Sequence, residues 1–445
     1  MLSSKFIKSF QYIAKYILIV IFIFSTVLPV YAQKNNASIE KSKAKTYFSD
    51  INKMVKRDNK KLWGKSLYVP FLFVDMETKD VAANEADNKG ILKKQGTIYI
   101  GKFPENQIIA NSVTNLGDKE YAMVEWQSSD TDELSRNALF MHEIFHYHQK
   151  SLGLESPEGQ PSNAHLDEMD ARIYLKLEWA ALNKAINSTG QQKITAITDA
   201  LTFRQYRREQ YDCSENENIL EIHEGIPEYT GIVCASKSES DIKQLMKKEY
   251  SNSLNKESFV RSFAYYSGSA YGILIDEKNS NWRKKLTYNS DLGEILKDSY
   301  KIDVSSNSVE KAKNRYNYKQ IYQEELSRKQ VLDKKLLEYE NKFINHPIIT
   351  IELDKPKIGF NPNNLVPLKD IGTVYPNITI TDSFGTLNLK SGGCLLSSDW
   401  KKATISADNL KIENEKLSGD DWTIRLNSNY TILEENKSYI IKQIN

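Results

Sequence analysis

The spacing of apolar residues changes along the chain and predicts different secondary structure before and after position 130. Segment 38–63 is polar and helix-favouring, and short runs rich in β-branched and aromatic residues then predict strands at 66–74, 96–100 and 121–126. From 130 to 343 the apolar residues recur with the helical period, which predicts helices at 132–152, 163–187, 192–211, 215–232, 258–275 and 308–343.

Beyond the His-Pro pair at 346–347 the alternation of apolar and polar residues returns. It predicts strands, separated by Asn-Pro and Gly-Gly turns, at 348–353, 373–381, 387–389, 422–426 and 439–441. We therefore expect an α+β fold with three parts after residue 32: a helix and small sheet at 33–130, a helical block at 131–345 and a β-rich domain at 346–445. The charged stretch at 309–343 is interpreted as a solvated helix or helical hairpin that joins the last two parts.

Residues 1–32 have the pattern of an export signal. Three lysines precede an apolar run at 16–28, and Pro29 and the sequence Val-Tyr-Ala at 30–32 follow it. An uncleaved anchor is the alternative, but the run is shorter than the roughly 20 residues that a spanning helix needs. We expect cleavage before Gln33, a mature protein with no transmembrane segment, and a periplasmic or extracellular location.

Composition limits the kinds of partner that the protein can bind and the ways in which its cysteines can pair. The chain has 60 basic and 58 acidic residues, so its formal net charge of +2 gives no basic footprint for nucleic acid or for an anionic membrane surface. Export would permit a disulfide between Cys213 and Cys234, with Cys394 free, and three buried thiols are the alternative.

The sequence His-Glu-Ile-Phe-His at 142–146 contains the pattern His-Glu-x-x-His on a predicted helix. Asp130 with Glu133 predicts the start of this helix, and Gly153 predicts its end. Residues four apart lie on one helix face, so both histidines can reach a single zinc ion. Glu143 adjoins the first of them and is positioned to act as a general base on a zinc-held water.

A catalytic zinc site needs a third protein ligand besides His142 and His146, while water takes the fourth position. Three glutamates of the predicted helices are candidates. Glu168 is the nearest in sequence, Glu178 follows on the same helix, and Glu224 lies further along the chain. Spacing alone favours Glu168.

Local sequence favours Glu224. The segment Leu-Glu-Ile-His-Glu-Gly-Ile-Pro-Glu-Tyr at 220–229 resembles the Glu-Gly-x-Ala-x-Tyr helix of the gluzincin metallopeptidases, in particular their aminopeptidase-type branch. The resemblance implies a zincin-like catalytic domain that hydrolyses peptides, with one Zn²⁺ held by His142, His146 and Glu224. Independently of the family, Glu228 lies four residues after Glu224 on the same helix face, where it can accept the other N–H of a ligating histidine.

The segment departs from the family pattern at two positions. His223 stands where the aminopeptidase-type motif has Asn, and Pro227 stands where it has Ala. Because proline lacks a backbone N–H and clashes with the preceding helical turn, we expect a kink after Glu224.

The resemblance also implies a tyrosine that stabilises the oxyanion, in the context Tyr-x-x-Gly. Tyr265 has this context, and Tyr266 and Tyr271 are alternatives. Zincins also bind substrate along an edge strand of the sheet, and 121–126 occupies that position in the sequence. Glu125 is a candidate for holding a substrate amine there, and a plain amphipathic edge strand is the simpler interpretation.

Three functions are compatible with these residues. The first is a secreted zinc peptidase, with Glu143 and Tyr265 as catalytic residues and a peptide or protein as substrate. The second is a non-catalytic binding or structural protein whose β-rich domain docks a surface partner, and the third is a zinc hydrolase of a non-peptide amide or ester. The retained Glu143 argues against the second, because a structural zinc site is normally closed by four protein ligands and needs no base.

Overall fold

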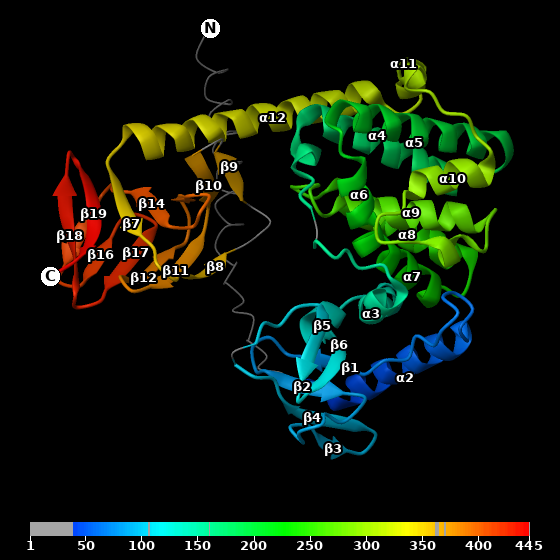
Figure 1. The fold of residues 1–445 in the computed structure, drawn as a ribbon, viewed down its shortest axis with the longest axis horizontal. Helices are drawn as coiled ribbons and strands as arrows, with labels where there is room; N and C mark the ends of the chain where they lie inside the picture. Colours follow the sequence, from blue (N-terminus) through cyan, green and yellow to red (C-terminus); the bar gives the residue numbers. More distant parts are fainter. Residues whose placement is uncertain (1–38, 106, 160, 361–364, 369–370, 445) are drawn as a thin grey trace, which may run out of the picture. The chain divides into compact units, whose positions relative to one another are not determined.

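The computed structural model describes residues 39–105, 107–159, 161–360, 365–368 and 371–444 (Figure 1). It confirms the α+β class, because a small sheet, a helical block and a β-rich region follow one another along the chain. The described residues divide into two compact units, one ending at Ser49 and resuming over Pro70–Asp130, the other formed by Asp50–Val69 and the chain from Thr131 onward. The predicted export signal lies outside the described residues.

Six strands form the sheet of the first unit, in the order β3-β4-β2-β1-β6-β5. They are β1 (Phe71–Val74), β2 (Asp80–Ala83), β3 (Lys93–Gln95), β4 (Ile98–Lys102), β5 (Ser112–Leu116) and β6 (Lys119–Glu125). Strand β6 lies between β1, to which it is parallel, and β5, to which it is antiparallel. The prediction that 121–126 is an edge strand is therefore wrong, because the mostly polar strand β5 covers that edge and gave no clear signal in the sequence.

The helical block belongs to the second unit. Its helices are α3 (Glu133–Gln149), α4 (Met169–Ile186), α5 (Gly190–Tyr211), α6 (Ser214–Leu220), α7 (Ile226–Ala235), α8 (Glu239–Leu254), α9 (Phe263–Asp276), α10 (Leu292–Tyr300) and α11 (Val309–Lys313). Helix α7 packs along both α3 and α9, and α4 packs along α5. A π-helical turn, η4 (Glu221–Gly225), joins α6 to α7, so the predicted helix at 215–232 is not uniform. None of the helices in the described part of the chain combines the length and the hydropathy of a membrane span.

Helix α12 (Tyr318–Glu340) is mostly solvated, as its charge pattern predicts. The carboxylate of its buried Glu325 forms ion pairs with Arg172 at 2.8 Å, Lys176 at 2.6 Å and Arg328 at 2.7 Å. Near the other end of α12, apolar side chains pack on a small core that includes Leu368. The helix thus contacts α4 with one end and the β-rich region with the other.

Two sheets make up the β-rich region, in the orders β18-β19-β7-β14-β13-β10-β9 and β15-β16-β17-β12-β11-β8. The strands are β7 (Ile348–Glu352), β8 (Lys357–Phe360), β9 (Val366–Leu368), β10 (Gly372–Tyr375), β11 (Ile378–Asp382), β12 (Gly385–Leu389), β13 (Cys394–Leu396), β14 (Lys402–Ser406), β15 (Lys411–Glu413), β16 (Lys416–Ser418), β17 (Trp422–Leu426), β18 (Tyr430–Glu435) and β19 (Ser438–Gln443). Residues of both sheets share one apolar core. The predicted strand 373–381 is two strands in different sheets, because Pro376 interrupts the pairing.

The cysteines of the chain are all buried thiols in this structure. Cys213 precedes α6, Cys234 lies in α7 and Cys394 lies in β13. Of the two alternatives drawn from the sequence, the structure therefore has the three thiols and not the bridge between Cys213 and Cys234.

Candidate metal centre

Helix α3 carries the His-Glu-x-x-His sequence. Its N-cap is Asp132, whose carboxylate accepts a hydrogen bond from the Ser135 N–H at 2.9 Å, so the predicted start at Asp130 was two residues early. Gly153 adopts a left-handed conformation after the last turn and ends the helix as predicted. His142 and Glu143 are each 4% exposed, so both residues are buried.

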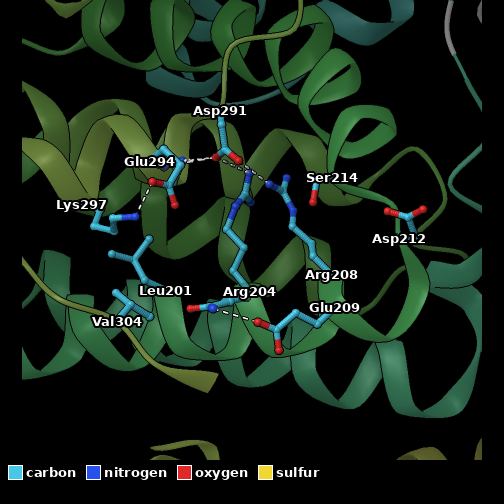
Figure 2. A pocket seen from close by; sticks show the side chains of 12 residues that line it. Leu201, Arg204, Arg208, Glu209, Asp212, Ser214, Asp291, Glu294, Lys297 and Val304 are labelled. Carbon is cyan, nitrogen blue, oxygen red and sulfur yellow. Dashed lines mark hydrogen bonds and ion pairs between the residues drawn. The ribbon is translucent and has the colours of Figure 1, made fainter. Parts of the chain in front are cut away.

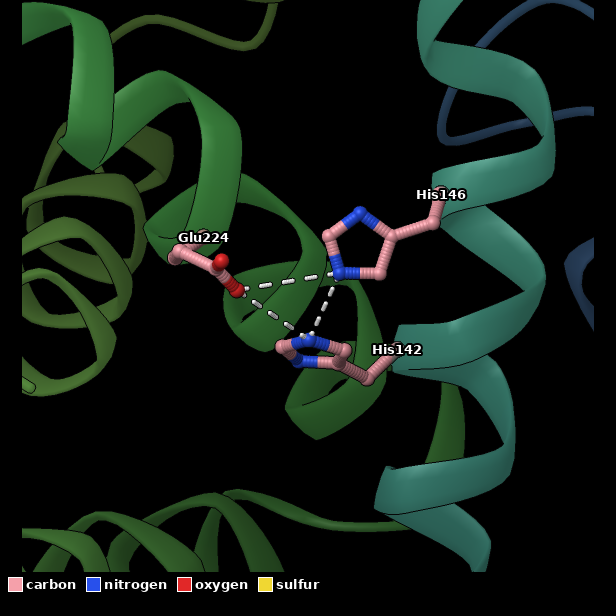
Figure 3. A group of neighbouring side chains, drawn as sticks. All are labelled: His142, His146 and Glu224. Carbon is pink, nitrogen blue, oxygen red and sulfur yellow. Dashed lines mark hydrogen bonds and ion pairs between the residues drawn. The ribbon is translucent and has the colours of Figure 1, made fainter. Parts of the chain in front are cut away.

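Three side chains from α3 and η4 converge on one point (Figure 3). Nε2 of His142 and Nε2 of His146 are 3.0 Å apart. Oε2 of Glu224 lies 3.9 Å from the first nitrogen and 3.7 Å from the second. Ligand atoms from all three residues thus lie within 4.8 Å of one another. This separation suits one ion bound at about 2.0–2.2 Å by each atom.

Each histidine ring is held from behind by an acceptor. Glu228 Oε2 lies 2.9 Å from Nδ1 of His142, which is the contact that the sequence predicts. Gln149 Oε1 lies 2.6 Å from Nδ1 of His146, and the Gln149 amide donates in turn to the backbone oxygen of His223 at 2.8 Å. These acceptors favour the proton on each Nδ1, so the two Nε2 lone pairs face one another. A cation or a proton must lie between them.

The pKa shifts of the two histidines and of Glu224 also indicate that a cation fits between these side chains. Burial alone would lower the pKa of His142, but the hydrogen bond with Glu228 and the nearby carboxylates raise it to about 9. Burial and the charge of His142 lower the pKa of His146 to about 3. Burial raises the pKa of Glu224, but the neighbouring histidines and a hydrogen bond from Tyr265 lower it overall. Without metal, the histidine pair thus carries one proton more than two neutral rings, and this positive charge lies beside the Glu224 carboxylate, where a divalent cation fits the charge.

Glycines bring the three helices of the site into close contact. A Cβ on Gly225 would lie 2.6 Å from the Ala264 oxygen and 2.6 Å from Cα of Gly268, so η4 and α9 touch through their backbones. A Cβ on Gly231 would lie 2.5 Å from the Ala138 oxygen, so α7 and α3 touch in the same way. The glycine of the Tyr-x-x-Gly sequence therefore serves helix packing beside the site.

Buried arginines anchor the π-helical turn that carries Glu224. Arg204 pairs with the carboxylate of Glu221, the first residue of η4, through both terminal nitrogens, one of them at 2.7 Å. Arg204 and Arg208 also reach Asp291, at 3.5 and 2.7 Å. These three residues, whose charges are paired with one another or with Glu221, line a cavity of about 300 Å³ (Figure 2). Pro227 is the second residue of α7, and the irregular backbone is the π-helical turn η4, which contains Glu224 and ends two residues before Pro227, so the distortion lies at Glu224 and not after it.

Tyr265 is the tyrosine that reaches the site. Its ring stacks on that of His142, with centroids 5.6 Å apart and planes 6° apart. Burial, the charge of Glu224 and a hydrogen bond to Glu224 raise the Tyr265 pKa, so its hydroxyl stays protonated. The other two candidates lie elsewhere: Tyr271 donates to Glu178 at 2.7 Å, and the buried ring of Tyr266 packs against Trp179.

The alternative glutamates are occupied or remote. Glu178 is buried and pairs with Arg207, and Glu168 is an exposed residue at the start of α4. Glu125 accepts a hydrogen bond from Ser128 at 3.2 Å within the first unit. The structure therefore brings Glu224, and neither Glu168 nor Glu178, to the histidine pair.

A second group of possible ligands, His165, Cys213 and Glu217, also lies within 4.8 Å. Arg207 and Arg208 each donate to the Glu217 carboxylate at 2.8 Å. Burial raises the pKa of the Cys213 thiol to about 12. With two guanidinium groups on the carboxylate and a protonated thiol, this group suits a structural ion cluster and not a metal.

Sequence reasoning missed two residues of the site. Gln149 lies three positions after His146 on the same helix face, and this spacing could have identified it. Arg261 donates to Glu224 Oε1 at 2.8 Å from the turn before α9, and no local pattern indicates it. No protein-family model matches the chain, and no curated protein or solved structure is found to be similar to it. The resemblance to gluzincins therefore depends on the two helices alone.

Proposed function

We propose that this protein is a zinc-dependent peptidase. The observation that carries the proposal is the pair of Nε2 atoms 3.0 Å apart, with Glu224 beside them and an acceptor behind each ring. Two imidazoles and one carboxylate are the donor set of catalytic zinc sites, which keep a fourth position open. His142, His146 and Glu224 would hold the ion, and when bound, zinc would act as a Lewis acid and make water a nucleophile near neutral pH.

Glu143 would be the general base. Its carboxylate is buried, and its negative charge helps to raise the pKa of both His142 and Tyr265, which indicates that it lies close to both. It would take a proton from the attacking water and return it to the leaving amine. Tyr265 would donate a hydrogen bond from its hydroxyl to the developing oxyanion, and its raised pKa means that the hydroxyl still carries its proton.

The exported location belongs to the same proposal. An export signal at 1–32 would deliver the mature chain, from Gln33 onward, to the periplasm or the medium. A peptide or protein outside the cytoplasm would then be the substrate, and the β-rich region is available for docking to a surface or partner. The near-neutral net charge of +2 favours neither nucleic acid nor an anionic membrane as that partner.

Metal analysis and peptide digestion test the proposal together. We expect the purified mature chain to bind about one equivalent of zinc, to cleave a mixed peptide library and to lose this activity on chelation. Glu143→Gln should keep the metal and lose about 10²- to 10⁴-fold in rate, because the amide cannot accept the proton. Folded protein that binds no zinc would instead support a binding or structural role. Zinc binding without cleavage of any peptide would support a different amide or ester as substrate.

A further inference from the structure

The turn before α9 holds Arg261 in a fixed position beside the candidate metal centre. The Asp167 carboxylate accepts hydrogen bonds from the Phe259 N–H at 2.8 Å and from the Ser258 hydroxyl at 2.6 Å. The Phe259 ring is fully buried and packs on Trp179, with centroids 4.9 Å apart. Arg261 therefore extends from an anchored turn.

The guanidinium of Arg261 has unused donors. Its side chain is 62% exposed, and within the described residues its hydrogen bonding is limited to the contact of Nη2 with Glu224 Oε1 at 2.8 Å. A guanidinium has five N–H donors in a fixed planar arrangement, which leaves a pair of them for one more acceptor. Planar pairs of N–H groups match the two oxygens of a carboxylate.

The exposure of Arg261 distinguishes it from the groups that only orient a ligand. Glu228 and Gln149, which hold the two histidines, have side chains that are largely enclosed. A group whose sole role is to fix Glu224 would gain from similar enclosure, because a hydrogen bond is stronger away from water. Arg261 instead adds an accessible positive charge next to Glu224, whose carboxylate lies between Arg261 and the histidine pair.

We infer that Arg261 binds a carboxylate of the substrate close to the bond that is cleaved, an inference that rests on the proposed peptidase function. The carboxylate can be the C-terminus of a peptide or an acidic side chain. In the first case the enzyme removes residues from the C-terminal end. In the second case it prefers Asp or Glu near the scissile bond.

Equilibrium binding to the zinc-loaded Glu143→Gln protein separates these cases, because nothing needs to be hydrolysed. Three acetylated peptides serve as probes: Ala-Phe-Ala with a free C-terminus, the same peptide as the C-terminal amide, and Ala-Phe-Asp as the amide. We expect the free acid to bind at least about 10-fold more tightly than its amide if the C-terminus is recognised, and the Asp peptide to show this gain if the side chain is recognised.

Adding Arg261→Gln to this protein should abolish the gain, and Arg261→Lys should restore part of it. Arg425→Gln, which removes an exposed arginine charge from β17, is the matched control and should keep the gain in full. An unchanged gain in Arg261→Gln would overturn the inference, as would binding of both carboxylate peptides no better than the neutral amide. Lower zinc affinity in Arg261→Gln with an unchanged gain would show that Arg261 only orients Glu224. Digestion by the wild-type protein is measured separately, so the peptidase function can fail while carboxylate binding holds, or the reverse.

Discussion

Replacing Glu224 should weaken zinc binding far more than replacing Glu168 or Glu178. The carboxylate of Glu224 lies 3.7–3.9 Å from both Nε2 atoms, a separation that one shared ion can bridge. Glu168 is exposed at the start of α4, and Glu178 is buried against Arg207 and Tyr271. Loss of metal in a Glu224→Ala protein that is still folded would therefore come from the removed carboxylate.

The size of the effect can be worked out from the number of ligands. Structural zinc sites with four protein ligands bind zinc with about 10–16 kcal/mol, or about 2.5–4 kcal/mol for each ligand. Since 1.4 kcal/mol corresponds to a factor of ten, Glu224→Ala should weaken zinc by about 10²- to 10³-fold. Glu178→Gln should leave zinc affinity unchanged but lower the free energy of unfolding by about 3 kcal/mol, because it removes the charge of a buried ion pair. Glu168→Ala should change either quantity little, by about 0.5 kcal/mol or less.

Competition with a chromogenic zinc chelator measures the affinity of each variant. Circular dichroism and urea unfolding report whether the same samples are folded and how stable they are. The reasoning would be refuted if folded Glu224→Ala kept the affinity of the wild type. It would also be refuted if folded Glu168→Ala or Glu178→Gln lost zinc, because the third ligand would then be the glutamate nearer in sequence.

Two further predictions can be checked with the same methods on other variants. Glu228→Ala and Gln149→Ala should each weaken zinc by about 10- to 100-fold, because each removes the acceptor that orients a histidine ring. Unchanged affinity in both would mean that the rings need no support. Asp291→Asn should lower stability at pH 7: burial raises the Asp291 pKa, but Arg204 and Arg208 outweigh burial and lower it from 3.8 to about 2. The stabilisation by this carboxylate is therefore complete above about pH 4 and is lost as the pH falls towards 2, so urea unfolding of variant and wild type should converge. A stability difference that stays constant with pH would contradict this assignment.

The parts of the site that could be predicted from sequence depend on local helix geometry. The four-residue spacing of the histidines places them together on any regular helix, and the Glu224-to-Glu228 spacing led to the contact between Glu228 and His142. Gln149 follows the same rule and could have been found. Arg261 depends on how the turn before α9 folds onto Asp167, and a single sequence carries no periodic signal for such a long-range contact.

The helix and strand content was also easier to predict than the pairing of strands. Charge spacing identified α12 as a solvated helix, and alternation identified the β-rich region. The place of β6 inside its sheet depended on β5, a short strand with few apolar residues. The division of 373–381 between two sheets depended on Pro376, which removes one backbone donor at the point where the chain crosses over. Both features are set by partners distant in sequence.

The π-helical turn η4 alters the phase of the helix on which it lies. In a regular α-helix each residue advances by about 100°, so Glu221 and Glu228, seven positions apart, would point the same way. Here Glu221 points to Arg204 and Glu228 points to His142. Because the π-helical turn is wider than an α-helical one, Glu221 points away from the histidines, while Glu224 and Glu228 point towards them. Chain length within 221–225 is therefore as important as residue identity. Shortening this turn by one residue would rotate everything after it, and Glu221 and Glu228 could no longer both reach their partners.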